Sequence, residues 1–290
     1  MRFNYFEPTS VEEALDTLRE GDGRYKLLAG GTDLIIHLRR GVTRYDALVN
    51  IKLLPDIATL SAKPGEGIRF GAAASLRSIE TSLMVRERYP ALAEAIRVIG
   101  SLQLRNSATI GGNICNASPS ADSAPALMVS GASVSCRISG NGSVVVPVED
   151  FFEGPGRSVL GSTGLLLAVD VPEPLGLTGN SFERFTPRNA MDIAIASAAS
   201  QVTLAQSSGL IEEVAIALGA VAPTPVRARK AEDVLRGKQP TPELLETAAE
   251  SAMDECRPID DIRGSAKYRR EIIRVLVRRT LERAISRAKP

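Results

Sequence analysis

The sequence has few of the residues that hold metals or perform acid–base chemistry. Its 290 residues contain only three cysteines and one histidine, His37. Cys115, Cys136 and Cys256 form no CxxC pair, so their spacing predicts neither a zinc nor an iron–sulfur site, and their odd number argues against a disulfide framework. One histidine excludes a multi-histidine metal centre and most His-dependent triads, and we expect an ordinary packed or solvent-bridged role for it. Difficult chemistry would therefore fall to a bound organic cofactor.

The sequence also lacks long hydrophobic runs. No apolar stretch reaches the roughly 18–20 residues needed to cross a bilayer. Residues 1–15 carry acidic groups early and lack the hydrophobic core of a signal peptide. With 44% hydrophobic residues, the chain is long enough for two globular domains. We therefore expect a cytoplasmic protein without a transmembrane segment.

Charge is nearly balanced overall, at +1, but it is unevenly distributed. From Arg263 onward there are ten Lys and Arg residues and two acidic ones. A basic helix of this kind could bind nucleic acid. Few aromatic residues are present there for base stacking, however, and apolar residues recur near helical spacing, so one face should pack. We favour a solvated face or a subunit contact over nucleic acid. The apolar residues are Ile272, Ile273, Leu276, Leu281 and Ile285.

Hydrophobic periodicity and turn residues predict an α+β chain with two domains, 1–175 and 176–290. In the first, divided at about 1–55 and 56–175, strands and helices mix without the regular βαβ rhythm of a doubly wound sheet. Ser10 and Glu13 resemble a capping box that starts a helix. Two helical segments parted at Pro90 are expected over 78–100, and Asn141-Gly142 predicts a hairpin turn. The second domain should contain antiparallel strands of one sheet, followed by helices.

Two double-glycine segments are the most informative feature that is present. LLAGGTDLI spans 27–35 and ATIGGNICNASPSAD spans 108–122. Glycine permits positive φ and close approach of a ligand, and consecutive N–H groups in such a turn form an anion-binding concavity. P-loop, Rossmann and kinase motifs are absent. The pair suggests a diphosphate held between two backbone cradles, although tight turns alone remain a simpler explanation, especially for the first pair.

Polar side chains crowd the second segment. Turn chemistry needs only one or two of them, and the remainder need hydrogen-bond partners that a polar ligand could supply. These side chains belong to Thr109, Asn113, Asn116, Ser118, Ser120 and Asp122.

The segments AGGTDL and TIGGNICNASPSAD, together with the later FERFTPRNAMDIA, resemble the FAD-binding subunit of molybdenum hydroxylases. That family includes the medium subunit of aerobic carbon monoxide dehydrogenase and the flavin domain of xanthine dehydrogenase. The resemblance spans essentially the whole chain. It implies a two-part FAD-binding domain of the vanillyl-alcohol-oxidase-like (PCMH) type, then a smaller C-terminal α+β domain of the carbon monoxide dehydrogenase flavoprotein type. It also implies FAD as the cofactor.

The resemblance implies site residues as well. It implies that Asp122 contacts the adenosine side of FAD, that the backbone of Leu166 meets the adenine end, and that Arg184 lies near the flavin. A cation at that point could stabilise anionic reduced flavin. Thr32 stands where some relatives have histidine, and the cysteine-bearing insertion of benzoyl-CoA-type reductases is missing. No catalytic residue or metal ligand is implied. The first diphosphate segment corresponds to Leu28, Ala29, Gly30, Gly31, Thr32 and Asp33, and the second to Thr109, Ile110, Gly111, Gly112 and Asn113.

The family's activity implies partners. A large subunit with the molybdenum cofactor oxidises the substrate, a small subunit with two [2Fe–2S] clusters passes electrons to the flavin, and an external acceptor (quinone, NAD or oxygen) receives them. Ile36 or Ile99 could wall the flavin ring, although we expect both in the core. The alternatives are a self-sufficient FAD oxidoreductase of the same fold and a non-enzymatic scaffold that has lost its flavin.

Overall fold

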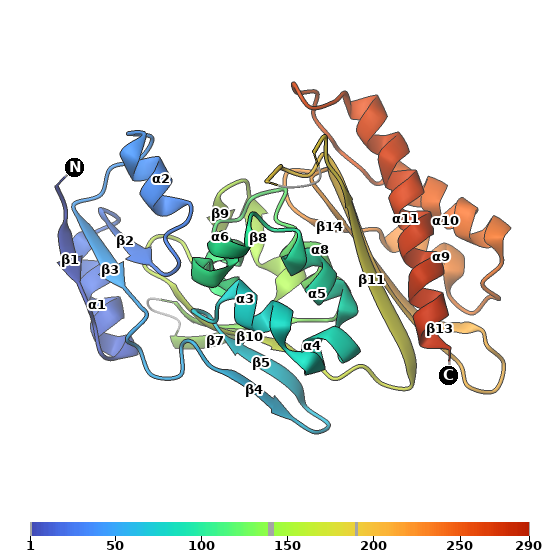
Figure 1. Ribbon diagram of the computed structural model, residues 1–290, viewed down its shortest axis with the longest axis horizontal. Coiled ribbons are helices and arrows are strands. Elements are labelled where there is room, and N and C mark those ends of the chain that lie inside the picture. The colour runs from blue at the N-terminus through green and yellow to red at the C-terminus, as the bar shows by residue number, and fades with distance from the viewer. Residues whose placement is uncertain (1, 139–141, 189–190, 290) are drawn as a thin grey trace.

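The computed structural model describes residues 2–138, 142–188 and 191–289, which form an N-terminal lobe, a central part and a C-terminal part in a row (Figure 1). The lobe contains a three-stranded parallel sheet in the order β1-β3-β2. Its first helix starts where the capping pair predicts, because Ser10 Oγ accepts a hydrogen bond from Glu13 N at 3.1 Å. The lobe is built from β1 (Asn4–Phe6), α1 (Val11–Gly21), β2 (Tyr25–Leu28), α2 (Leu34–Arg39) and β3 (Ala47–Asn50).

A five-stranded antiparallel sheet underlies the central part, in the order β4-β5-β10-β6-β7. β6 and β7 pair with Ile138 opposite Gly142. Asn141 of the expected hairpin turn lies outside the described residues. The strands are β4 (Leu60–Lys63), β5 (Gly67–Gly71), β6 (Ser133–Ile138), β7 (Gly142–Pro147) and β10 (Leu165–Val171), with a short η1 (Val148–Asp150) and the pair β8 (Phe152–Gly154) and β9 (Arg157–Ser158) between β7 and β10.

Short helices cover this sheet, and their number differs from the expected two over 78–100. Three helices are present, because Ser82 ends α3 and its Oγ accepts from Val85 N at 3.5 Å to start α4. Pro90 begins α5 at the first helical position, where its missing N–H costs nothing. The helices are α3 (Leu76–Thr81), α4 (Leu83–Arg88), α5 (Pro90–Arg97), α6 (Leu102–Ser107), α7 (Ile110–Cys115) and α8 (Ser123–Val129).

The C-terminal part has the expected antiparallel sheet, in the order β11-β12-β13-β14, followed by helices. The apolar stripe of the last helix is buried at Ile273, Leu276 and Leu281, which confirms that one face packs. Arginines on its other faces pair with acids of the same chain, as Arg279 does with Glu183 at 3.0 Å. The elements are β11 (Leu177–Phe185), β12 (Ala196–Leu204), β13 (Ile211–Gly219), β14 (Val226–Arg227), α9 (Arg229–Leu235), α10 (Pro242–Asp254) and α11 (Ala266–Ala288).

This second sheet has a hydrophobic core on each face. α11 lies along one face, and α5 and α8 of the central part cover the other (Figure 1). Phe182, Ala199 and Ala217 belong to the core of the central part, whereas neighbouring residues such as Ala198 and Leu218 belong to the core under α9, α10 and α11. Because side chains alternate along a strand, one sheet serves both cores.

Two adjacent residues of β11 illustrate this double packing. A Cβ at Gly179 would lie 2.2 Å from Ala284 O, so only glycine lets α11 approach so closely. Asn180 points to the other face, where its Oδ1 accepts from Ala91 N at 2.8 Å and its Nδ2 donates to Arg88 O at 3.3 Å. Asn180 thereby satisfies an N–H of the first turn of α5, which has no acceptor within its own helix.

Across the described residues, none of the helices combines the length and the apolar character that a membrane span requires. The longest of them, α11, carries arginines throughout its 23 residues.

Replacement of Asn180 by alanine tests the tie between β11 and α5. We expect Asn180→Ala to lower the free energy of unfolding by about 2–3 kcal/mol, because it leaves a buried N–H and a carbonyl without partners. Denaturant titration of the purified chain measures this loss. Gln206→Ala, at an exposed position, is the control and should stay within about 0.5 kcal/mol of the parent. Equal stability of the two variants would show that the tie contributes nothing.

Candidate cofactor site

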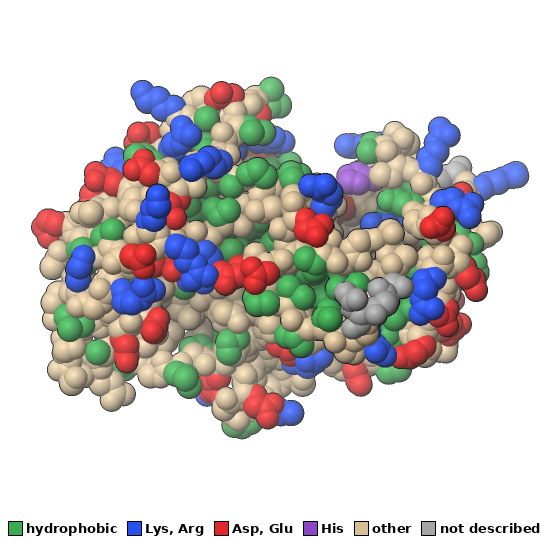
Figure 2. Space-filling model, turned by 180° about the vertical axis from the view of Figure 1, so that it is seen from behind, with side chains coloured by type: hydrophobic (Ala, Val, Ile, Leu, Met, Phe, Trp, Pro, Cys, Tyr) green, Lys and Arg blue, Asp and Glu red, His purple; other side chains and the backbone are tan. Residues whose placement is uncertain are grey.

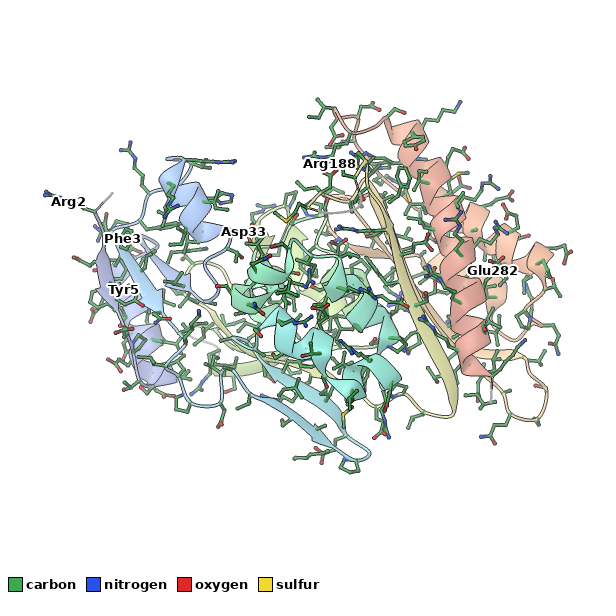
Figure 3. All side chains as sticks on the ribbon, in the orientation of Figure 1. Arg2, Phe3, Tyr5, Asp33, Arg188 and Glu282 are labelled. Carbon is green, nitrogen blue, oxygen red and sulfur yellow. The ribbon has the colours of Figure 1, made fainter. Side chains whose placement is uncertain are left out.

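The first glycine segment leaves a run of backbone donors free. It connects β2 to α2, and Gly31 has a φ of +72°, whereas Gly30 has no positive φ. Within the described part of the chain, the N–H groups of Gly30, Gly31, Thr32 and Asp33 have no acceptor. Asp33 is exposed at the start of α2, on the side of the lobe that faces the central part (Figure 3). Four successive free N–H groups form the kind of concavity that binds an anion.

The structure brings this segment against the start of the second one. Ser107 Oγ donates to Gly30 O at 2.9 Å. A Cβ at Gly30 would lie 2.4 Å from Ser107 O and 2.8 Å from Ala108 Cα, so glycine is required for the contact. Seen from behind, the outline of the molecule is notched between the N-terminal lobe and the C-terminal part (Figure 2). Sequence reasoning missed Ser107, whose only signal was a hydroxyl two residues before Thr109.

The second segment begins a helix instead of forming a turn. Thr109 caps α7 by accepting from Gly112 N at 3.1 Å. Gly111 N donates to Ala72 O at 2.9 Å and Ile110 N to Ala74 O at 3.1 Å, and neither Gly111 nor Gly112 has a positive φ. The expectation of a second cradle of free N–H groups is therefore wrong, because protein acceptors already use these donors.

The two glycines of this helix differ in what surrounds them. A Cβ at Gly111 would lie 2.6 Å from Ala72 O, so Gly111 lets α7 pack on the end of β5. Gly112 is exposed, and a Cβ there would have only Thr109 Oγ1 nearby, at 2.8 Å. Asn113 is turned toward α8, where its Oδ1 accepts from Ser123 Oγ at 2.6 Å. Gly112 thus leaves one side of α7 bare, which is the side a ligand can approach.

Asp122 and Arg184 form a buried ion pair. Arg184 Nη1 lies 2.6 Å from Asp122 Oδ2, and the two side chains are only 7% and 6% exposed. Asp122 Oδ1 is buried and has no hydrogen-bond partner among the described residues. Burial raises the pKa of Asp122 to about 6, although the charge and hydrogen bond of Arg184 act in the opposite direction. A buried carboxylate oxygen without a donor is costly, so a donor from a ligand would stabilise this arrangement.

The resemblance to the family implies that Asp122 contacts the adenosine side of FAD and that Arg184 lies near the flavin. The structure places the two side chains in contact with each other.

Leu166 lies deeper in the fold than the glycine segments. Its side chain is 2% exposed, and its backbone lies beside an irregularity of β10 between Leu166 and Ala168. At that irregularity Leu167 O accepts from Ala72 N at 2.9 Å, and Ala72 O in turn accepts from Gly111 N. Ala72 therefore connects this part of β10 to the start of α7.

The remaining candidates lie around the first segment and α7. Leu28 and Ala29 are half-buried at the end of β2, and Thr109 and Ile110 are buried. Ile36 is 44% exposed on α2, so the expectation that it belongs to the core is wrong. Arg39 of the same short helix is exposed as well. His37 is exposed.

Among the residues that the structure describes, no cluster of three or more His, Cys, Asp or Glu side chains could hold a metal ion. Burial raises the pKa of Cys115 to about 12 and that of Cys256 to about 12. Both thiols therefore stay protonated near neutral pH, whereas a metal ligand must be a thiolate.

The raised pKa of Asp122 predicts a pH dependence of stability. The folded state keeps a proton on Asp122 up to a pH of about 6, whereas the unfolded chain loses it near the usual value of 3.8. Stability from this group is therefore fully present below about pH 4 and is lost as the pH rises through 6. Relative to Asp122→Asn, the parent should gain about 3 kcal/mol between pH 7 and pH 4. Denaturant titrations at several pH values measure the free energy of unfolding of both proteins. Asp233→Asn, at an exposed position, is the control. Parallel pH profiles for the parent and Asp122→Asn would contradict the prediction.

Comparison with known proteins gives matches over nearly the whole chain. Residues 1–174 match the FAD binding domain in molybdopterin dehydrogenase, and residues 181–284 match the CO dehydrogenase flavoprotein C-terminal domain. The chain is 30% identical over 286 residues to a xanthine dehydrogenase FAD-binding subunit of Escherichia coli, covering 98% of this chain and 97% of that one. It is 32% identical to the carbon monoxide dehydrogenase medium chain of Hydrogenophaga pseudoflava, covering 99% and 98%.

Solved structures agree with these relatives. A structure of carbon monoxide dehydrogenase from Hydrogenophaga pseudoflava superposes with a TM-score of 0.94 at 32% identity, over 99% of this chain and 98% of that one. Quinoline 2-oxidoreductase from Pseudomonas putida 86 superposes with a TM-score of 0.91 at 26% identity, over 99% and 98%. These matches show that the chain belongs to the FAD-binding subunits of the molybdenum hydroxylase family, the oxidoreductase components of the carbon monoxide and xanthine dehydrogenase type.

Proposed function

We propose that this chain holds FAD between the first glycine segment, the bare side of α7 and the Asp122–Arg184 pair, and that it relays electrons within a larger molybdenum hydroxylase. The observation that carries the proposal is the run of four acceptor-free N–H groups from Gly30 to Asp33. A diphosphate is an anion whose oxygens match such a run. The same proposal includes an FAD-binding domain of residues 1–175, divided at about residue 55, and a second domain of residues 176–290. It also includes a cytoplasmic location.

Each group of residues has a role that follows from its chemistry. The N–H groups from Gly30 to Asp33 donate to diphosphate oxygens, and Ser107 holds the carbonyl of Gly30 so that the segment keeps its shape. Gly112 leaves room beside α7. The unpartnered Oδ1 of Asp122 accepts an N–H or O–H of the cofactor, and Arg184 supplies a buried positive charge at the same place. Leu28, Ala29, Thr109, Ile110, Gly111, Asn113 and Leu166 complete the proposed set.

Bound FAD would supply the redox chemistry for electron transfer from a [2Fe–2S] cluster of a small partner subunit to quinone, NAD or oxygen. Oxidation of the substrate belongs to a large partner subunit with the molybdenum cofactor. The residues of this chain bind and orient the cofactor and set the charge around it. None of them needs to act as a general acid, a general base or a nucleophile.

Substitution of Gly112 tests the cofactor site. It avoids the clash with Ala72 O that a side chain at Gly111 would cause. We expect Gly112→Val to lose most of its FAD, because the new side chain occupies the bare side of α7, and to stay folded, because the nearest atom is a movable hydroxyl. FAD released on denaturation, measured per chain, gives the result, and circular dichroism checks the fold. Glu250→Val, which places the same side chain at an exposed position of α10, is the control. Unchanged FAD content in Gly112→Val would refute the assignment of α7 to the site.

The relay role predicts a difference between the isolated chain and its complex. We expect the chain to copurify with two other subunits, and the substrate of that complex to reduce the bound flavin. The isolated, FAD-loaded chain should not oxidise that substrate, since it contributes no residue for the chemical step. Stopped-flow absorbance of the flavin measures both. Turnover of a small substrate by the isolated chain would favour a self-sufficient oxidoreductase, and a chain that takes up no FAD would favour a scaffold.

A further inference from the structure

A second concave site lies away from the proposed cofactor site, where α3, α4 and α5 meet the end of α11. The cavity has a volume of about 560 Å³, within the size range of small-molecule sites. Pro90 and Ala93 provide its apolar lining. The charged groups around it are Arg77, Glu80, Arg86, Glu94, Arg97 and Arg287, and we call it the arginine groove.

The two carboxylates of the groove are already engaged. Glu80 lies 2.9 Å from Arg105 Nε, beneath the groove, and 3.0 Å from Arg77 Nη1. Burial tends to raise the pKa of Glu80, but the hydrogen bonds and charges of Arg105 and Arg77 outweigh it and hold that pKa below its usual value. Glu94 accepts from Phe182 N at 2.9 Å and pairs with Arg287. Four guanidinium groups thus line the groove beside two carboxylates, and positive charge is in excess.

Three of the four groove arginines, Arg77, Arg86 and Arg287, are held by hydrogen bonds to the chain while part of each remains available. Arg86 Nε donates to Glu80 O at 2.8 Å, and Arg287 Nη1 donates to Asn180 O at 2.7 Å. Arg86 and Arg97 form no ion pair with any described residue, in contrast to Arg77 and Arg287. A guanidinium has five N–H donors in a planar fork that matches phosphate oxygens. The groove therefore presents several partly immobilised forks to one concave space.

We propose that the arginine groove binds a small molecule with two or more phosphate charges, through Arg86 and Arg97 with Arg77 beside them. Excess positive charge in a concave site attracts anions, and guanidinium–phosphate contacts are among the strong hydrogen bonds. The cavity volume of about 560 Å³ is of the size that a small ligand fills.

The groove is separate from the proposed FAD site. Arg287 contacts the backbone of Asn180, whereas Arg184 lies four residues further along β11, about 13 Å away at the usual rise of a strand. The inference therefore does not rest on the proposed function, and loss of one site should leave the other intact.

The test is calorimetric titration of inorganic pyrophosphate into the FAD-loaded chain at physiological ionic strength. We expect saturable binding, tighter than that of inorganic phosphate. The double variant Arg86→Gln, Arg97→Gln, in which both positions are exposed, should lower the affinity by about tenfold or more, because each charge-assisted hydrogen bond is strong. FAD content should not change.

A matched variant controls for net charge. Lys230→Gln, Lys267→Gln removes two exposed cations elsewhere, Lys267 being at the opposite end of α11 from Arg287, and it should bind pyrophosphate as the parent does. Equal loss in both double variants would show non-specific charge attraction and overturn the proposal. The absence of saturable binding would also overturn the proposal. If Arg86→Gln, Arg97→Gln then weakened association with a copurifying subunit, the groove would be assigned to an acidic protein partner.

Discussion

The sheet β11–β14 must be covered on both faces, and the rest of the molecule is arranged to satisfy that requirement. α11 covers one face and α5 with α8 the other, and small residues on both sides keep these helices close. Gly179 admits α11, and Ala199 and Ala217 admit the central part. Burial of apolar surface on two faces is the largest favourable contribution available to a four-stranded sheet. It also fixes where the end of β11 lies relative to α8.

That placement creates the Asp122–Arg184 pair. Arg184 is near the end of β11 and Asp122 directly precedes α8, so the contact between these two elements buries both charges together. A buried pair is costly to form from solvated ions, and it is strongly destabilising to remove only one member. The unpartnered Oδ1 of Asp122 adds to that cost. The favourable packing of the two cores offsets this cost. It keeps the carboxylate of Asp122 and the guanidinium of Arg184 in position for a ligand of the proposed site.

Short-range features were predictable from the sequence, and long-range ones were not. The Ser10 cap, the turn at Gly31 and the antiparallel strands after residue 176 depend on neighbouring residues or on periodicity. The helical start at Thr109 was missed, since glycine disfavours helix and the stabilising acceptors, Ala72 O and Ala74 O, come from another segment. The break at Ser82 was missed because serine can act as a cap or lie within a helix. The contact of Asp122 with Arg184 joins residues 62 positions apart. Asp122 stood out among the polar side chains of the second segment, whereas only the resemblance to a family had pointed to Arg184.

Because one sheet contributes to two cores, the covalent link between the parts is not what holds them together. The link, residues 172–176, carries Leu175 at 75% exposure, whereas Asn180, Glu94 and Arg287 tie the parts through buried and half-buried contacts. A cut in that link would leave the sheet in place between its helices. The central and C-terminal parts match two separate family descriptions, yet they share a hydrophobic core across one face of this sheet.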